Sequence, residues 1–236
     1  MGDLALFGFG PAGWGAAMLR ATLVSLAVAV SAFLIGAALG SVIAAAKLSS
    51  RRALRAAGDA YTTVLRGVPD LLVIYLVYFG GSAVVTRIGT AMGVDGFLGL
   101  PSFLAGALAC GLVSAAYQAE VFRGAVLAMP RGQMEAARAL GMDGPLRFRR
   151  ILAPQVLTLA LPGLGNVWQL ALKESALVSV TGLVELLRQS QIGAGSTRQP
   201  FAFYMAAGAL YLGLTTVSTL LFGRAEWRLA RPLRRP

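Results

Sequence analysis

Residues 21–46, "ATLVSLAVAVSAFLIGAALGSVIAAA", carry no charged side chain. A helix needs about 20 consecutive apolar residues to cross the hydrocarbon core of a bilayer, so this stretch is long enough to span one. Within it, Gly36 and Gly40 have the GxxxG spacing that lets another helix approach closely. The same spacing also fits two unrelated glycines in an alanine-rich helix, and the sequence alone favours neither interpretation.

The whole chain is unusually apolar. Hydrophobic residues make up 57% of the 236 residues and charged residues 13%, with a mean hydropathy of +0.71, well outside the range of soluble domains. We therefore predict an all-α integral membrane helical bundle in which residues 1–236 form a single domain. No cleavable signal peptide is expected, because Asp3 is present and no basic residue precedes Arg20.

The distribution of positive charge predicts how the chain crosses the membrane. The net charge is +11, but the arginines flank apolar runs, which favours a topology signal and contact with anionic lipid over a nucleic-acid partner. A basic cluster that starts at Lys47 follows the first apolar run, and a second that starts at Arg224 follows the last. We predict a multi-pass protein with its N-terminus outside and its C-terminus in the cytoplasm.

We expect about five transmembrane helices. The second predicted span is interrupted near its beginning by "RGVPD", where Pro69 breaks or starts a helix and Arg66 and Asp70 are spaced to pair. The third begins at Pro101, and residues 174–200 predict a short helix at the outer surface. The predicted spans are about 14–46, 61–86, 101–122, 156–175 and 201–223.

A polar loop at residues 130–155 separates the third and fourth predicted spans, and it contains "EAARALGMDGPLRFRRILAP" at 135–154. Strong helix formers favour a first helix over 131–140. Gly141 can supply the left-handed residue that ends it, and Asp143 starts a second short helix. The residues alone fit a cytoplasmic docking element and a solvated loop equally well.

The same loop carries a motif: E-A-A, three residues, Gly, nine residues, Ile, two residues, Pro. It resembles the signature loop of the permease subunits of bacterial ABC importers, although Ala153 stands where the family often has Leu. The stretches "AYQAEVFRGAVLAMPRGQMEAARALGM" and "ALPGLGNVWQLALKESALVSVTGL" are similar to the polar amino acid subfamily, in particular the permeases for histidine, lysine, arginine, ornithine or opines. The residues that the resemblance assigns to ATPase coupling are Glu135, Ala136, Ala137, Gly141, Asp143, Ile151 and Pro154.

This resemblance covers about Leu19 to Arg228 and implies a type I ABC importer permease in the bacterial inner membrane. It implies that the loop is a coupling helix that docks on a cytoplasmic ATPase dimer. The other implied partners are a periplasmic substrate-binding protein and a second permease, with a related chain favoured over another copy. ATP and Mg²⁺ would be bound by the ATPase, so no cofactor is expected on this chain. The implied substrate is a polar amino acid, with a basic one or an opine favoured.

The residues argue against catalysis by this chain. Neither lysine follows a glycine, since Lys47 and Lys173 follow Ala46 and Leu172, so a phosphate-binding P-loop is absent. The chain has no histidine and one cysteine, which excludes a Ser-His pair and leaves no expected metal site. A self-sufficient secondary transporter or channel remains an alternative, although such proteins usually need no docking hairpin.

Ionisable residues inside the spans are the candidates for substrate binding, because they are costly in hydrocarbon. Asp70 and Glu120 are spaced to pair with Arg66 and Arg123, which also fits structural ties. Glu174 is the favoured residue, since the resemblance implies that an acid in this stretch serves basic substrates, but contact with water or the second permease fits its position as well. The candidates are Glu174, Asn166, Trp168, Gln169, Asp70 and Glu120.

Overall fold

The computed structural model describes residues 6–11, 13–94 and 96–230. All regular secondary structure among these residues is helical, and five helices are long and apolar enough to cross a membrane. The predicted all-α membrane bundle is confirmed. The candidate spans are Gly15–Lys47, Asp70–Ala91, Ser102–Ala128, Gly144–Thr181 and Pro200–Leu229.

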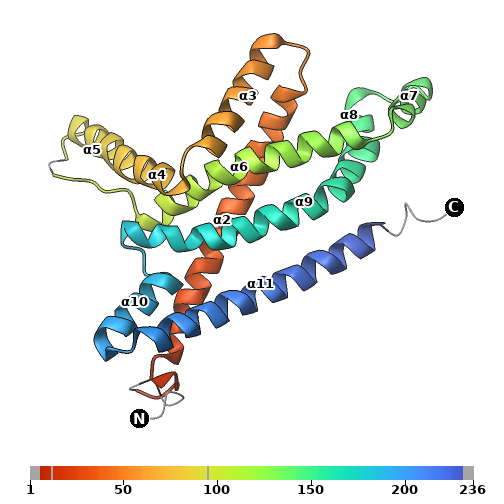
Figure 1. The fold of residues 1–236 in the computed structure, drawn as a ribbon. Coiled ribbons are helices and arrows are strands. Elements are labelled where there is room, and N and C mark those ends of the chain that lie inside the picture. Colours follow the sequence, from red (N-terminus) through yellow and green to blue (C-terminus); the bar gives the residue numbers. More distant parts are fainter. Residues whose placement is uncertain (1–5, 12, 95, 231–236) are drawn as a thin grey trace.

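The bundle has two distinct ends (Figure 1). Helix α10 (Leu186–Thr197) lies near the N-terminus at one of them, which we call the α10 end. The opposite, hairpin end carries α3 (Arg52–Gly67) and the polar hairpin of residues 131–152. The hairpin comprises α7 (Arg131–Ala139), α8 (Gly144–Arg147) and the π-helical turn η2 (Phe148–Leu152).

The long helices connect these ends. Helix α2 (Gly15–Lys47) crosses the others steeply, whereas α6 (Ser102–Ala128) and α9 (Ala153–Glu174) run side by side. Helix α11 (Pro200–Ala230) packs on α9 and α10 and leads to the C-terminus at the hairpin end. A short 3-10 helix, η3 (Ser175–Thr181), continues α9 toward α10. Several helices are longer than the predicted spans, because a helix can continue beyond the hydrocarbon core of the membrane.

Helices α2 and α6 form the most extensive helix pair in the bundle. A Cβ atom added to Gly36 would lie 2.6 Å from both the Ser114 Oγ and the Gln118 Nε2, so only glycine fits there. One GxxxG step further, a Cβ on Gly40 would lie 3.0 Å from the Ala115 oxygen. Gln118 Nε2 also donates a hydrogen bond to the Phe33 carbonyl oxygen at 2.9 Å. The GxxxG pair is therefore a packing seam, with polar groups that join the two helices.

The second span differs from the prediction of residues 61–86. Helix α3 ends at Gly67, Val68 is extended, and the candidate span starts only at Asp70, with Pro69 as the capping residue. Proline has no N–H and disfavours a helical conformation in the residue before it, which explains the break. The span is built from α4 (Asp70–Tyr75), the π-helical η1 (Leu76–Gly80) and α5 (Gly81–Ala91).

The sequence predicts a short helix at the outer surface within residues 174–200. Helix α10 lies in this segment, but part of it is buried in the bundle. Leu186, the first residue of α10, is completely buried. It packs in a cluster with Met18 of α2 and Phe203 of α11. This cluster fixes α10 across the ends of both long helices.

Gly36→Val tests the seam. We expect a lower thermal unfolding midpoint of the detergent-purified chain, because overpacking a close contact typically costs about 1–3 kcal/mol. Gly213→Val in α11 is the matched control, since an added Cβ there meets nothing within 4 Å. Equal midpoints for the two variants would contradict a close α2–α6 contact.

Candidate functional site

The hairpin has the local structure that its sequence predicts. Helix α7 ends before Gly141, which has φ +74°, the left-handed conformation that favours glycine. The Asp143 carboxylate then caps α8 by accepting a hydrogen bond from the Leu146 N–H at 2.9 Å. On the other side of the turn, Arg147 Nη1 donates to the Met142 carbonyl oxygen at 3.2 Å. These contacts stabilise a bent, compact hairpin.

The outer surface of the hairpin carries charged groups together with small and apolar ones. Ala137 is buried inside it, whereas Glu135 and Ala136 are exposed. Leu140 at the turn is 78% exposed, and an added side chain at Gly141 would meet nothing within 4 Å. A fixed turn with an exposed leucine and open space around it is suited to contact with another protein.

A charge network lies where α2, α3 and α6 meet at the hairpin end. The side chain of Lys47 is 7% exposed and its Nζ lies 3.0 Å from the Asp59 carboxylate. It also contacts the Glu120 carboxylate and donates to the Thr62 hydroxyl at 2.7 Å. Glu120 in turn accepts from Arg123 Nε at 2.9 Å. The expected Glu120–Arg123 pair is present, and Lys47 extends it to three helices.

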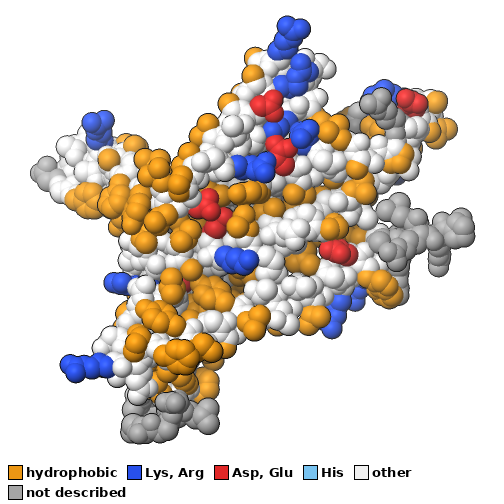
Figure 2. Space-filling view, in the orientation of Figure 1, with side chains coloured by type: hydrophobic (Ala, Val, Ile, Leu, Met, Phe, Trp, Pro, Cys, Tyr) orange, Lys and Arg blue, Asp and Glu red, His pale blue; other side chains and the backbone are white. Residues whose placement is uncertain are grey.

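The expected Arg66–Asp70 ion pair is wrong. No ion pair joins them among the described residues, and the Arg66 guanidinium lies over the Tyr117 ring, 5.3 Å from its centroid. The helix break at Pro69 takes the two side chains out of the i, i+4 geometry on which the prediction depended. Figure 2 shows basic and acidic side chains interspersed over α3.

Asp70 instead faces Glu174. The two carboxyl groups, from α4 and α9, lie close enough to influence each other electrostatically. Glu174 is 4% exposed, and no donor among the described residues reaches its Oε1 atom. Cys110 of α6 lies beside the pair, with its Sγ 3.9 Å from the Glu174 carbonyl oxygen. Cys110 belongs to a buried apolar cluster that includes Val73, so apolar residues lie on one side of the pair.

Neither carboxyl group of this acidic pair makes an ion pair with a residue in the described part of the chain. Two acids in contact inside a membrane span are expensive unless they hold a proton or meet a cation. The pair can therefore bind a cationic group, and it offers two carboxyl groups to a forked donor such as guanidinium.

The other predicted residues lie elsewhere. Trp168 packs against Phe33, with ring centroids 5.6 Å apart. Gln169 Nε2 donates to the Thr219 Oγ1 of α11 at 3.2 Å, and Asn166 is exposed. Trp168 Nε1 and Gln169 Oε1 are buried without a hydrogen-bond partner among the described residues.

Glu120 lies ten residues from Cys110 along α6, a distance of about 15 Å in a helix. Trp168 and Gln169 face α2 and α11, whereas Glu174 faces α4 and α6. The six predicted residues therefore do not form one site. Only Asp70 and Glu174 come together.

The role of Glu185 could not be predicted from the sequence. It is completely buried and caps α10, accepting hydrogen bonds from the backbone N–H groups of Leu187 at 2.9 Å and Arg188 at 2.7 Å. The hydroxyl groups of Ser25 and Tyr211 donate to it at 3.1 Å each. Burial raises the pKa of Glu185, while these four hydrogen bonds oppose the rise. Its partners lie far away in sequence, so no local pattern reveals the cluster.

The structure combines five candidate membrane spans, an acidic pair inside the bundle and a polar hairpin at one end, which is the arrangement expected of a membrane transport subunit. Residues 36–231 match the family described as "Binding-protein-dependent transport system inner membrane component". The chain belongs to this family and is a multi-pass permease of the inner membrane, not an enzyme. The family resemblance predicted from the sequence is confirmed.

Individual proteins of this kind are similar over almost the whole chain. The octopine transport system permease protein OccQ of Rhizobium meliloti is 60% identical, with 100% of this chain and 99% of that protein covered. The histidine/lysine/arginine/ornithine transport system permease protein HisQ of Escherichia coli is 40% identical, with 89% and 92% covered. A crystal structure of an amino acid ABC transporter with histidines has a TM-score of 0.76 at 33% identity, with 91% and 95% covered. In such systems, ATP hydrolysis belongs to a partner ATPase.

Glu185→Ala tests the anchor of α10. Removing a buried acceptor with four donors should lower the free energy of unfolding by about 2 kcal/mol or more, because those donors lose their partner. The measurement is the thermal unfolding midpoint in detergent. Arg188→Ala, an exposed change on the same helix, should leave the midpoint nearly unchanged. A similar midpoint for both variants would show that Glu185 does not hold α10.

Proposed function

We propose that this chain is the permease subunit of an ATP-driven importer for a basic amino acid or an opine with a cationic group. The observation that carries the proposal is the acidic pair of Asp70 and Glu174, which has no cationic partner among the described side chains. Glu174 is buried and Asp70 is partly exposed, and two acids held close together without such a partner are costly. An ammonium or guanidinium group of the substrate relieves this cost.

The names of the similar permeases support this substrate class. They refer to octopine and to histidine, lysine, arginine and ornithine, which agrees with acidic recognition of a cationic group. Apolar residues lie on one side of the pair, where electrostatic attraction is less screened than in water. Trp168 and Gln169 contact α2 and α11 and Asn166 is exposed, so the proposal rests on the acidic pair and does not include these three residues.

Import requires the hairpin to contact an ATPase. In our proposal, the hairpin end is cytoplasmic, the N-terminus lies outside, and the turn at Gly141 docks on one subunit of an ATPase dimer. Exposed Leu140 and Ala136 give the turn an apolar contact surface. ATP and Mg²⁺ act on the ATPase, and a periplasmic binding protein delivers substrate to this chain and a second permease, for which a related chain is favoured over another copy. Conformational change then exposes the acidic pair to each side in turn.

Glu174→Gln tests the substrate class. The uptake assay uses proteoliposomes that contain the whole complex and substrate-loaded binding protein. We expect the half-saturating concentration of loaded binding protein to rise, or the uptake rate to fall, by about tenfold or more. The reason is that a hydrogen bond to a charged group contributes about 1.5–3 kcal/mol. The probes are radiolabelled arginine and octopine. Asp70→Asn should change uptake in the same direction.

Glu226→Gln, an acid-to-amide change in α11 outside the pair, is the matched control and should transport normally. ATPase activity without substrate reports whether each complex is assembled. If Glu174→Gln assembles and imports both substrates at the rate of the unchanged protein, the acidic pair does not recognise them.

Gly141→Arg tests the docking role of the hairpin. An arginine resists the left-handed conformation at φ +74°, so the tagged variant should recover much less ATPase after purification in mild detergent. Mass spectrometry of the copurified proteins provides the measurement and also detects the second permease and the binding protein.

Gly141→Asn is the matched control, because asparagine tolerates the left-handed region better than most residues, and it should retain most of the ATPase. Full recovery of the ATPase with Gly141→Arg would exclude docking at this turn. Substrate transport by the chain alone in liposomes without ATP would instead show a self-sufficient carrier.

A further inference from the structure

One side of α9 carries a stripe of polar residues, although α9 lies within a candidate membrane span. Successive members of this polar stripe are three, eight, three and four residues apart, which is close to whole turns of a helix with 3.6 residues per turn. All members are at least partly exposed, whereas Ala160, Leu164 and Ala171 on the opposite side of α9 are buried. The polar stripe comprises Gln155, Thr158, Asn166, Gln169 and Lys173.

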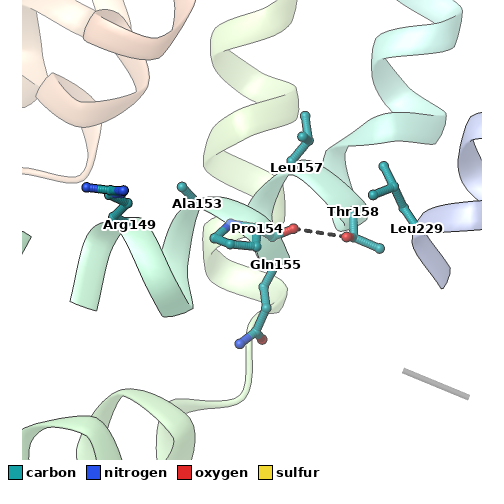
Figure 3. A pocket seen from close by; sticks show the side chains of 7 residues that line it. All are labelled: Arg149, Ala153, Pro154, Gln155, Leu157, Thr158 and Leu229. Atoms are coloured by element: carbon teal, nitrogen blue, oxygen red, sulfur yellow. Dashed lines mark hydrogen bonds between the residues drawn. The ribbon is translucent and has the colours of Figure 1, made fainter. Parts of the chain in front are cut away.

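The polar stripe begins at the hairpin end, in a hollow of about 520 Å³ between α9 and α11. Figure 3 shows Gln155 and Thr158 of α9 at this hollow, with Leu229 contributed by α11. Further along α9, Gln169 Nε2 donates a hydrogen bond to the Thr219 Oγ1 at 3.2 Å, so α11 adds a polar group beside the stripe. The stripe thus runs from this hollow to Lys173, next to the acidic pair.

Lys173 is the charged member of the stripe. It is exposed, and no ion pair joins it to any residue in the described part of the chain. A lysine on the outside of a span can extend to the lipid headgroups. That explains Lys173 alone, but not Asn166 and Gln169, which lie one and two turns further toward the hairpin end on the same side. This side of α9 is therefore suited to water, substrate or protein and not to acyl chains.

The chemistry of the proposed substrates indicates what Lys173 binds. Every amino acid and every opine carries a carboxylate in addition to its cationic group, and that carboxylate is costly inside a span unless it is paired. An ammonium group makes short, charge-assisted hydrogen bonds to a carboxylate. Of the groups near the acidic pair, Lys173 has the charge that the carboxylate needs.

The position of Lys173 beside Glu174 makes a shared ligand possible. Consecutive Cα atoms are about 3.8 Å apart, and consecutive side chains leave a helix about 100° apart. The two side chains therefore start from the same turn of α9 but point to different sides, and the lysine stem is long and flexible. One molecule with both charges can place its cationic group at the acidic pair and its carboxylate at Lys173.

We propose that Lys173 binds the carboxylate of the transported amino acid or opine while the acidic pair holds its cationic group. This inference rests on the proposed function, because it takes the acidic pair as the site of the cation. Lys173 then rejects amines that lack a carboxylate. The rest of the polar stripe provides polar contacts for the substrate between this site and the hairpin end.

The test compares L-arginine with argininamide, in which a neutral amide replaces the carboxylate. Saturation-transfer NMR measures weak binding of both ligands to the detergent-purified complex of the permeases and the ATPase, without binding protein. We expect the unchanged complex to bind arginine about tenfold or more tightly than argininamide, because only arginine offers Lys173 a charged acceptor. Lys173→Met should weaken arginine binding by about tenfold and leave argininamide binding nearly unchanged.

Two further variants serve as controls for charge. Lys173→Arg keeps the positive charge and should recover the preference for arginine. Arg87→Met removes an exposed cation of α5, outside the polar stripe, and should keep the preference. Thermal midpoints show that each complex is folded and assembled, and Lys173→Gln replaces Lys173→Met if the latter does not assemble.

Glu174→Gln separates this inference from the proposed function. It should weaken arginine and argininamide equally, since both keep the guanidinium group. If it does so while Lys173→Met changes neither ligand, as for a lysine at the lipid headgroups, the inference is overturned and the proposed function stands. Equal weakening of both ligands by Lys173→Met, with a lower thermal midpoint, would overturn it in favour of an ion pair with the second permease. No preference for arginine in the unchanged complex would also overturn it. If Glu174→Gln changes neither ligand, the proposed function fails, even where Lys173→Met abolishes the preference.

Discussion

The close approach of α2 and α6 is the constraint on which the rest of the structure depends. Lipid is as apolar as the side chains of a membrane helix, so two helices gain little by hiding apolar surface from it, and small residues and hydrogen bonds must hold them together. Gly36 and Gly40 provide the closeness, and Gln118 provides a hydrogen bond across the seam. Helix α9 then packs on α6, where Gly163 faces Val121. The relative placement of these helices decides which polar groups meet inside the bundle.

The ionisable groups inside the bundle are of two kinds, those with a partner of opposite charge and those without one. At the hairpin end, Lys47 is balanced by Asp59 and Glu120, which ties α2 and α3 to α6, the helix that leads into the hairpin. Nearer the middle, Asp70 and Glu174 face each other without a cation from the described chain. A balanced network stabilises the fold, whereas an unbalanced pair is costly in the absence of a ligand. This difference separates a structural cluster from a candidate binding site.

Sequence reasoning was most successful where local rules apply. Span number follows from the lengths of apolar runs, and the hairpin turn follows from Gly141 and Asp143, whose conformations depend on a few neighbouring residues. It failed where a pairing depended on unbroken helix geometry. Arg66 and Asp70 are four residues apart, but the break at Pro69 sends one to Tyr117 and the other toward Glu174.

The sequence by itself therefore determined the membrane class, the number of candidate spans, the hairpin and the family. It also indicated Asp70 and Glu174 separately as candidates, because any ionisable residue in an apolar span is conspicuous. Only the tertiary structure decided that these two face each other while Glu120 joins Lys47, and that Glu185 binds Ser25. The physical reason is that partners on different helices are chosen by helix rotation and close packing, which depend on contacts between residues far apart in the chain.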